Sequence, residues 1–167
     1  THMINGSHRL SPMYGFIKGF DRTLYKRQMK ASDVVNHFIE FDKIFKGKKF
    51  VWLTIWDLHF SRNNPGFGYD LFETNKIDKK VKSPYETENK IMKNIFYNKL
   101  TIIDENLFLI YKYIEKNYAK EEINVHLVSD HGQSYFDNNN HLLKDGRIKT
   151  PWVIMGHGIE QKNNIND

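Results

Sequence analysis

Two acid–histidine pairs stand at the ends of two hydrophobic segments. Asp57-Leu58-His59 follows the first segment, and Asp130-His131-Gly132 follows the second. A carboxylate and an imidazole are suitable ligands for a divalent cation. If both segments are neighbouring parallel strands, both pairs face one crevice at the carboxyl edge of the sheet. The alternative is that each acid caps a turn and each histidine packs against the protein.

The elements that would position these pairs follow from hydrophobic spacing. Apolar residues at helical spacing predict helices, and short continuous apolar runs predict strands that are buried on both faces of a parallel sheet. We expect a break near Asn98, because the second helix would otherwise be unusually long. The predicted order is a helix over 32–47, a strand over 49–56, a loop over 58–85, a helix over 86–118, a strand over 123–129, a loop over 131–149 and a strand over 152–155. The sequence therefore predicts an α/β fold with a largely parallel sheet flanked by helices.

The two ends of the chain show no such patterns. We interpret residues 1–3 as a cloning remnant that lies outside the fold, and the polar residues 161–167 as a frayed tail. Residues 4–30 are rich in Gly, Ser, Pro and aromatic side chains and predict loop with short elements at best. Residues 4–160 would then form one partial α/β domain.

Composition excludes several kinds of protein. The 167 residues contain no cysteine, so there is no disulfide framework, thiolate metal site or cysteine nucleophile in this segment. The net charge of +5 comes from lysines interspersed with 20 acids, and we expect no nucleic-acid partner. No apolar run approaches the roughly 20 residues of a membrane-spanning helix, and we expect no membrane contact from this segment. Oligomeric state and cellular location stay open.

The motifs resemble those of sulfatases and the wider alkaline phosphatase superfamily. Ser129-Asp130-His131-Gly132 after a hydrophobic strand, followed by Thr150-Pro151 and a further strand, is similar to the metal-binding segment of that superfamily. Trp56-Asp57-Leu58-His59-Phe60 resembles the sulfatase segment in which a strand ends in Asp-x-His. Gly19-Phe20-Asp21 resembles a recurrent element upstream of that strand. The resemblance spans about residues 15 to 159 and implies an alkaline phosphatase-like core.

The resemblance also implies roles for individual residues. Asp130 and His131 would bind a divalent cation, most suitably Ca²⁺, with Mn²⁺ or Zn²⁺ as alternatives. His59 would contact a sulfate- or phosphate-ester substrate, and Lys144 would also contact substrate. His141 matches a histidine that touches substrate or leaving group in some branches of the superfamily and binds metal in others. Asp57 would orient its turn, although in phosphodiesterase branches an acid and a histidine at this strand end bind a second metal.

The nucleophile of the superfamily lies upstream of the Gly-Phe-Asp element, and no matching Cys/Ser-x-Pro-x-Arg motif is present here. We therefore expect this chain to be the C-terminal part of a sulfatase catalytic core that is inactive alone. One alternative is a phosphoethanolamine transferase or phosphodiesterase of the same superfamily. Another is a non-catalytic interaction domain.

Overall fold

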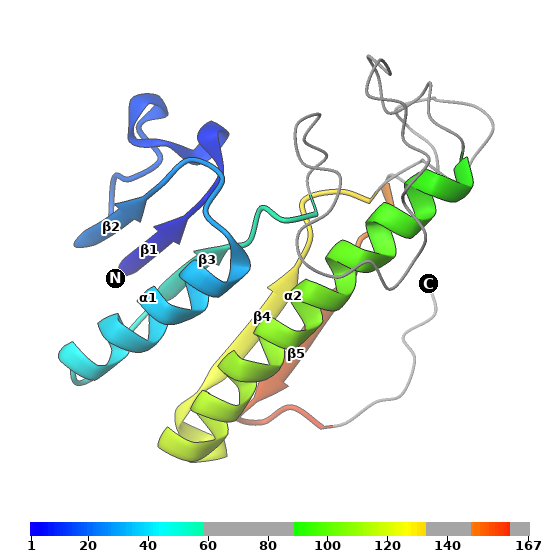
Figure 1. Cartoon of the computed structure of the whole chain (residues 1–167). Helices are drawn as coiled ribbons and strands as arrows, with labels where there is room; N and C mark the ends of the chain where they lie inside the picture. The colour runs from blue at the N-terminus through cyan, green and yellow to red at the C-terminus, as the bar shows by residue number, and fades with distance from the viewer. Residues whose placement is uncertain (59–88, 133–147, 161–167) are drawn as a thin grey trace. The chain divides into compact units, whose positions relative to one another are not determined.

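A computed structural model describes residues 1–58, 89–132 and 148–160 (Figure 1). The chain divides into two compact units, Thr1–Tyr111 and Lys112–Asp167, and each is described by itself. Both helices and strands are present, which confirms the predicted α/β class.

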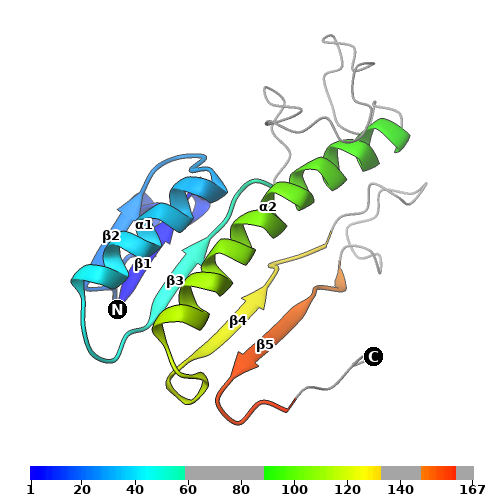
Figure 2. The same cartoon turned by 60° about the horizontal axis from the view of Figure 1, so that its bottom comes forward.

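The first unit contains a three-stranded parallel sheet. Its strands are β1 (His2–Asn5), β2 (Arg22–Tyr25) and β3 (Val51–Thr54), in the order β2-β1-β3 (Figure 2). In the register of the sheet, His2 pairs with Arg22 on one side and with Val51 on the other. The parallel arrangement is confirmed for this sheet, and β1 is its central strand.

The position of β1 corrects the expectation for the start of the chain. Residues 1–3 were expected outside the fold, yet His2 and Met3 belong to β1 and are buried. Ile4, in the same strand, is 0% exposed. Residues 4–30 also hold the four-residue strand β2, within a segment predicted as loop with short elements at best. Strands of four residues are too short to show a sequence period. Strand β1 is buried because it pairs with β2 and β3, which are distant in the sequence.

Helix α1 (Ala31–Ile44) contacts β1 and β3, and it agrees with the predicted helix apart from its ends. Val34, Val35 and Phe38 are buried on one side of this helix, as their spacing predicts. Figure 2 shows the helix lying across one face of the sheet. Asp42 of α1 forms an ion pair with Lys49, which ties the end of the helix to the chain that enters β3.

Helix α2 (Asn89–Asn117) is continuous, and the predicted break near Asn98 is wrong. Polar side chains inside the helix bond to carbonyl oxygens four residues earlier. Thr101 Oγ1 donates to the Tyr97 carbonyl at 3.0 Å, and Asn106 Nδ2 donates to the Ile102 carbonyl at 2.7 Å. These bonds satisfy the polar side chains without interrupting the helix.

The second unit contains a two-stranded sheet of β4 (Asn124–Val128) and β5 (Trp152–Gly156). Both strands were predicted, but they pair antiparallel, with Asn124 opposite Gly156. The parallel expectation is therefore wrong for this pair. Most side chains of β4 are exposed, so the expectation of a strand buried on both faces is also wrong here.

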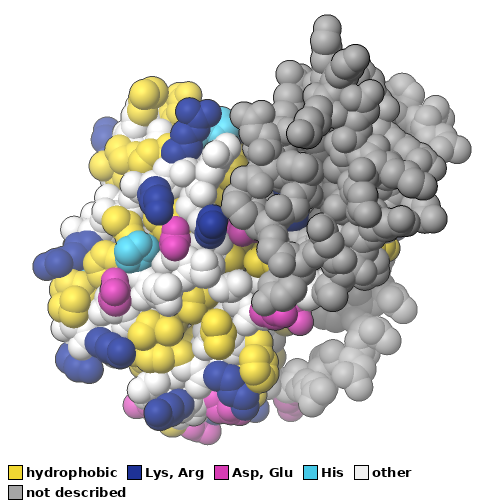
Figure 3. Space-filling view, in the orientation of Figure 1, with side chains coloured by type: hydrophobic (Ala, Val, Ile, Leu, Met, Phe, Trp, Pro, Cys, Tyr) yellow, Lys and Arg dark blue, Asp and Glu magenta, His cyan; other side chains and the backbone are white. Residues whose placement is uncertain are grey.

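No helix among the described residues is long and apolar enough to cross a bilayer. On the described surface in Figure 3, Lys and Arg side chains stand among apolar and acidic ones and do not form a continuous patch.

Truncating the centre of the parallel sheet should destabilise the chain. We expect Ile4→Ala to lower the free energy of unfolding by about 2–5 kcal/mol, because the fully buried side chain leaves a cavity. The control is Ile44→Ala, where the side chain is 68% exposed and the change should stay within about 0.5 kcal/mol. Urea denaturation followed by circular dichroism measures both variants. Equal effects would contradict the placement of Ile4 in the core.

Lowering the pH should also decrease the stability of the first sheet, because His2 of β1 becomes protonated. The ring is stacked on Phe45 at 4.7 Å and on Phe41 at 5.6 Å between centroids, and its Nδ1 has no hydrogen-bond partner in the described part of the chain. Burial lowers the pKa of His2, and the positive charges of the N-terminus, Arg22 and Lys49 lower it further, against the opposing effect of Asp21.

The folded state disfavours protonated His2. The free energy of unfolding is therefore unaffected by His2 above the ordinary histidine pKa of about 6.5, and it decreases as the pH falls below that value. We expect His2→Phe, which keeps an aromatic ring, to unfold with a weaker pH dependence between pH 7 and 5. Thermal unfolding at several pH values tests this expectation. Parallel curves for the two proteins would show that His2 does not contribute.

Candidate functional site

The turn that follows β4 carries the predicted metal-binding pair. Asp130 Oδ1 accepts a hydrogen bond from the backbone N–H of His131 at 3.0 Å. Ser129 Oγ donates to the His131 carbonyl at 2.7 Å, so hydrogen bonds within residues 129–131 hold the turn. Asp130 Oδ2 lies 3.7 Å from His131 Nε2. The structure therefore brings both predicted ligands together.

The imidazole of His131 is oriented by a backbone contact. Its Nδ1 atom lies 2.7 Å from the Gly132 carbonyl oxygen, which can only accept, so in the neutral ring the proton is assigned to Nδ1. Nε2, which lies 3.7 Å from Asp130 Oδ2, then carries the lone pair that a metal ion would need. Metal-binding histidines typically donate their second ring N–H to a carbonyl or carboxylate in this way.

Solvent reaches both side chains of this pair. The Asp130 side chain is 86% exposed and the His131 side chain is 37% exposed. Within the described ranges, no group of three or more His, Cys, Asp or Glu residues could hold a metal ion. Asp130 and His131 would thus supply two ligands, and two ligands alone bind a divalent cation weakly.

The turn after β3 places Asp57 in a different environment. Its Oδ2 atom is buried and has no hydrogen-bond partner in the described ranges. Burial raises the pKa of Asp57, because the charged carboxylate loses solvation. The backbone amides of Ala31 and of Asp57 itself, together with the charges of Lys99 and Lys30, act in the opposite direction.

Lys99 of α2 is the buried counterpart in the same unit. The residue is 6% exposed, which is rare for lysine. Burial lowers the pKa of Lys99, and the charge of Asp57 partly opposes this shift. The two groups therefore stabilise each other's charged form, while burial acts against both charges. The sequence analysis missed Lys99, because a single lysine on a long helix gives no sign that it is buried.

The other predicted site residues, His59, His141 and Lys144, lie outside the described residues. Strand β3 pairs with β1, whereas β4 pairs with β5, and the two strands belong to different units. The common crevice for both acid–histidine pairs stays a prediction.

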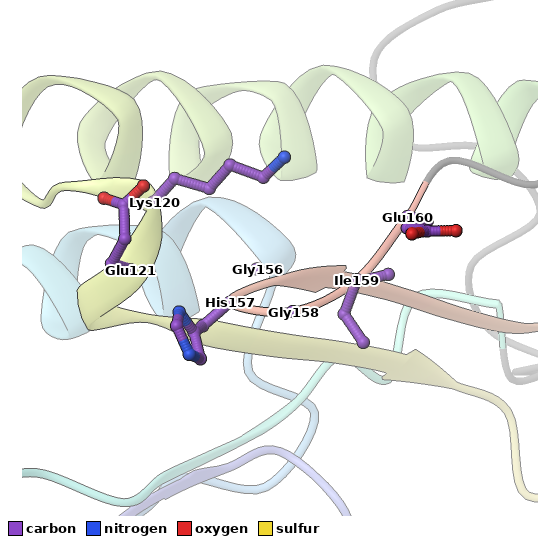
Figure 4. Close-up of a pocket in the computed structure, with 7 residues that line it drawn as sticks. All are labelled: Lys120, Glu121, Gly156, His157, Gly158, Ile159 and Glu160. Carbon is purple, nitrogen blue, oxygen red and sulfur yellow. The ribbon is translucent and has the colours of Figure 1, made fainter.

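A pocket that the sequence analysis did not identify lies beside the turn after β5. It is lined by Lys120 and Glu121 of the short helix η4 (Lys120–Glu122) and by the segment Gly156–Glu160. Gly156 has φ of 135°, and a Cβ atom there would lie 2.1 Å from the Ile123 carbonyl oxygen, so only glycine fits. Figure 4 shows the Lys120, His157 and Glu160 side chains pointing in different directions. These groups do not converge on one ligand position.

Neither a family model, nor a curated protein, nor a solved structure matches this chain. The resemblance to sulfatases thus rests on the motifs in the sequence.

The geometry predicts the tautomer of His131. At a pH where the ring is neutral, a long-range ¹H–¹⁵N spectrum should show the Nδ1–H form, because Nδ1 donates to the Gly132 carbonyl. Signals assigned by a His131→Gln control would identify the ring. A predominant Nε2–H form would contradict the proposed orientation of the metal-binding nitrogen.

Proposed function

We propose that this chain carries the metal-binding part of a sulfatase, a metal-dependent hydrolase of sulfate esters with an alkaline phosphatase-like core. The observation that supports the proposal most is the turn at Asp130 and His131, where Oδ2 and Nε2 are 3.7 Å apart and accessible to solvent. The parallel sheet with α1 across one face is compatible with such a core.

The donor set of the turn fits a divalent cation. It combines one carboxylate with one imidazole whose Nε2 lone pair is available, a set that Ca²⁺, Mn²⁺ and Zn²⁺ can all share with further ligands. A cation held there would neutralise negative charge on the nonbridging oxygens of a sulfate ester. The residues of the turn would bind the cation, and Ser129 would keep the backbone of His131 in place.

The proposal assigns substrate contact to His59, His141 and Lys144, whose side chains can donate hydrogen bonds to an anionic ester. The nucleophile would come from residues outside these 167, so the chain alone should bind metal without turning over substrate. Phosphate-ester chemistry, as in a phosphoethanolamine transferase or a phosphodiesterase, is the second candidate, because Ser129-Asp130-His131-Gly132 also suits that substrate class.

Metal titration tests the proposal. We expect isothermal titration calorimetry with Ca²⁺, Mn²⁺ or Zn²⁺ to show weak binding, with a dissociation constant on the order of 10⁻⁴–10⁻³ M for such an incomplete site. Asp130→Ala should abolish this binding. Glu105→Gln, which removes an exposed acid of α2, is the matched control and should leave it unchanged.

Binding that survives Asp130→Ala would contradict the assignment. The interaction-domain alternative would instead gain support from tight association of this chain alone with a defined partner.

A further inference from the structure

The two-stranded sheet carries exposed apolar side chains at the end that leads into the turn at Asp130 and His131. In the antiparallel register of β4 and β5 (Figure 2), Val128 lies opposite Trp152. Residues directly opposite each other in a sheet share a face. Val128 is 62% exposed and Trp152 is 66% exposed. Asp130 follows Val128 by two residues, which span at most about 7 Å of chain. An exposed indole therefore lies one strand away from the start of this turn.

A second ring lies beside the indole. The ring centroids of Trp152 and His126 are 6.2 Å apart, their planes are tilted by 33°, and Trp152 Nε1 donates to His126 Nδ1 at 3.4 Å. Side chains alternate between the two faces of a strand, so His126 shares the face of Val128 and Trp152. The His126 side chain is exposed as well. This face thus presents two adjacent rings and one aliphatic side chain to solvent, and none of the three has a carboxylate that would repel an anion.

The chemistry of this face suits a ligand with a flat apolar side. Clustered exposed apolar side chains mark binding surfaces, and aromatic side chains bind other rings by stacking on them. An ester whose oxygens bind a cation at Asp130 and His131 would hold its organic part close to that turn. The indole of Trp152 stands on the neighbouring strand. A cyclic organic part could stack on this indole, whereas an inorganic anion would leave the indole exposed.

We propose that Trp152, supported by His126, is a substrate-binding platform for sulfate esters whose organic part is a ring. The inference rests on the proposed function, because the turn at Asp130 and His131 must bind the cation that receives the ester oxygens. The shared chemistry of the ligand is a ring with one flat apolar side, which a sugar sulfate and an aryl sulfate both offer. The platform selects cyclic esters over open-chain esters, and the cleavage chemistry belongs to other residues.

Binding of defined probes to the full chain in the presence of Ca²⁺ tests the platform. The probes are phenyl sulfate and a galactose sulfate as cyclic esters, and methyl sulfate as the ester without a ring. An NMR spectrum of the indole N–H groups follows Trp152, whose signal is identified by its loss in Trp152→Leu. We expect at least one cyclic ester to shift this signal, whereas methyl sulfate leaves it in place. The cyclic ester with the lower Kd then shows whether the platform favours an aryl ring or a sugar.

Substitutions at exposed tryptophans separate stacking from binding of the sulfate group. Trp152→Leu should weaken binding of the preferred cyclic ester by about threefold to tenfold, because the stacked ring is lost. The same variant should bind methyl sulfate within about twofold of the unmodified chain, and Trp152→Phe should keep most of the affinity for the cyclic ester. Trp52→Leu is the matched control, because Trp52 is 46% exposed on β3 in the other unit, and it should bind like the unmodified chain. If Trp152→Leu does not fold, the indole signal of the unmodified chain still decides.

The outcomes that overturn the platform differ from those that refute the proposed function. An indole signal of Trp152 that neither cyclic ester shifts would overturn the inference, as would unchanged affinity of Trp152→Leu while Asp130→Ala loses binding. A signal that the cyclic ester shifts equally without Ca²⁺ and in Asp130→Ala would confirm the stacking and refute the proposed metal function. A shift that appears on raising the protein concentration without probe would place a second copy of the chain on this face and overturn the inference.

Discussion

The pairing of β1 with β2 on one side and with β3 on the other is the constraint on which the first unit depends. Three segments that are far apart in the sequence meet there, and the burial of Met3 and Ile4 requires both neighbours as well as α1. Because the register with β1 sets where β3 ends, it also sets where Asp57 leaves the sheet. The placement of that carboxylate therefore follows from the backbone pairing of the central strand.

The ends of β3 and β4 differ in their electrostatic environment. At the end of β3, burial raises the pKa of Asp57 and lowers the pKa of Lys99, and the charge of each group opposes the shift of the other. At the end of β4, Asp130 keeps its solvation and His131 is oriented by the Gly132 carbonyl. The same residue types at similar sequence positions are thus buried in one turn and exposed to solvent in the other.

The sequence was sufficient to predict the elements whose signal is the local spacing of apolar residues. Val34, Val35 and Phe38 at helical steps predicted α1, and the apolar runs predicted β3, β4 and β5. Strand β1 escaped prediction because its burial depends on residues some 20 and 50 positions away. The antiparallel pairing of β4 with β5 was missed because strand direction depends on how the chain returns, not on composition.

For the candidate site, the sequence predicted the types of the residues but not their orientation or burial. Asp130 and His131 stood out as a carboxylate beside an imidazole, but the ring nitrogen that faces the carboxylate follows from the contact between Nδ1 and the Gly132 carbonyl. The burial of Lys99 likewise depends on tertiary packing and has no local sequence signal.

The turn at Asp130 and His131 is proposed to bind a divalent cation. The most direct measurement is paramagnetic broadening of amide resonances by substoichiometric Mn²⁺ in the full chain. If the cation binds there, the amides of residues 129–132 should broaden selectively, and the effect should disappear in Asp130→Ala. Broadening spread evenly over the exposed acids, or centred on another segment, would contradict it.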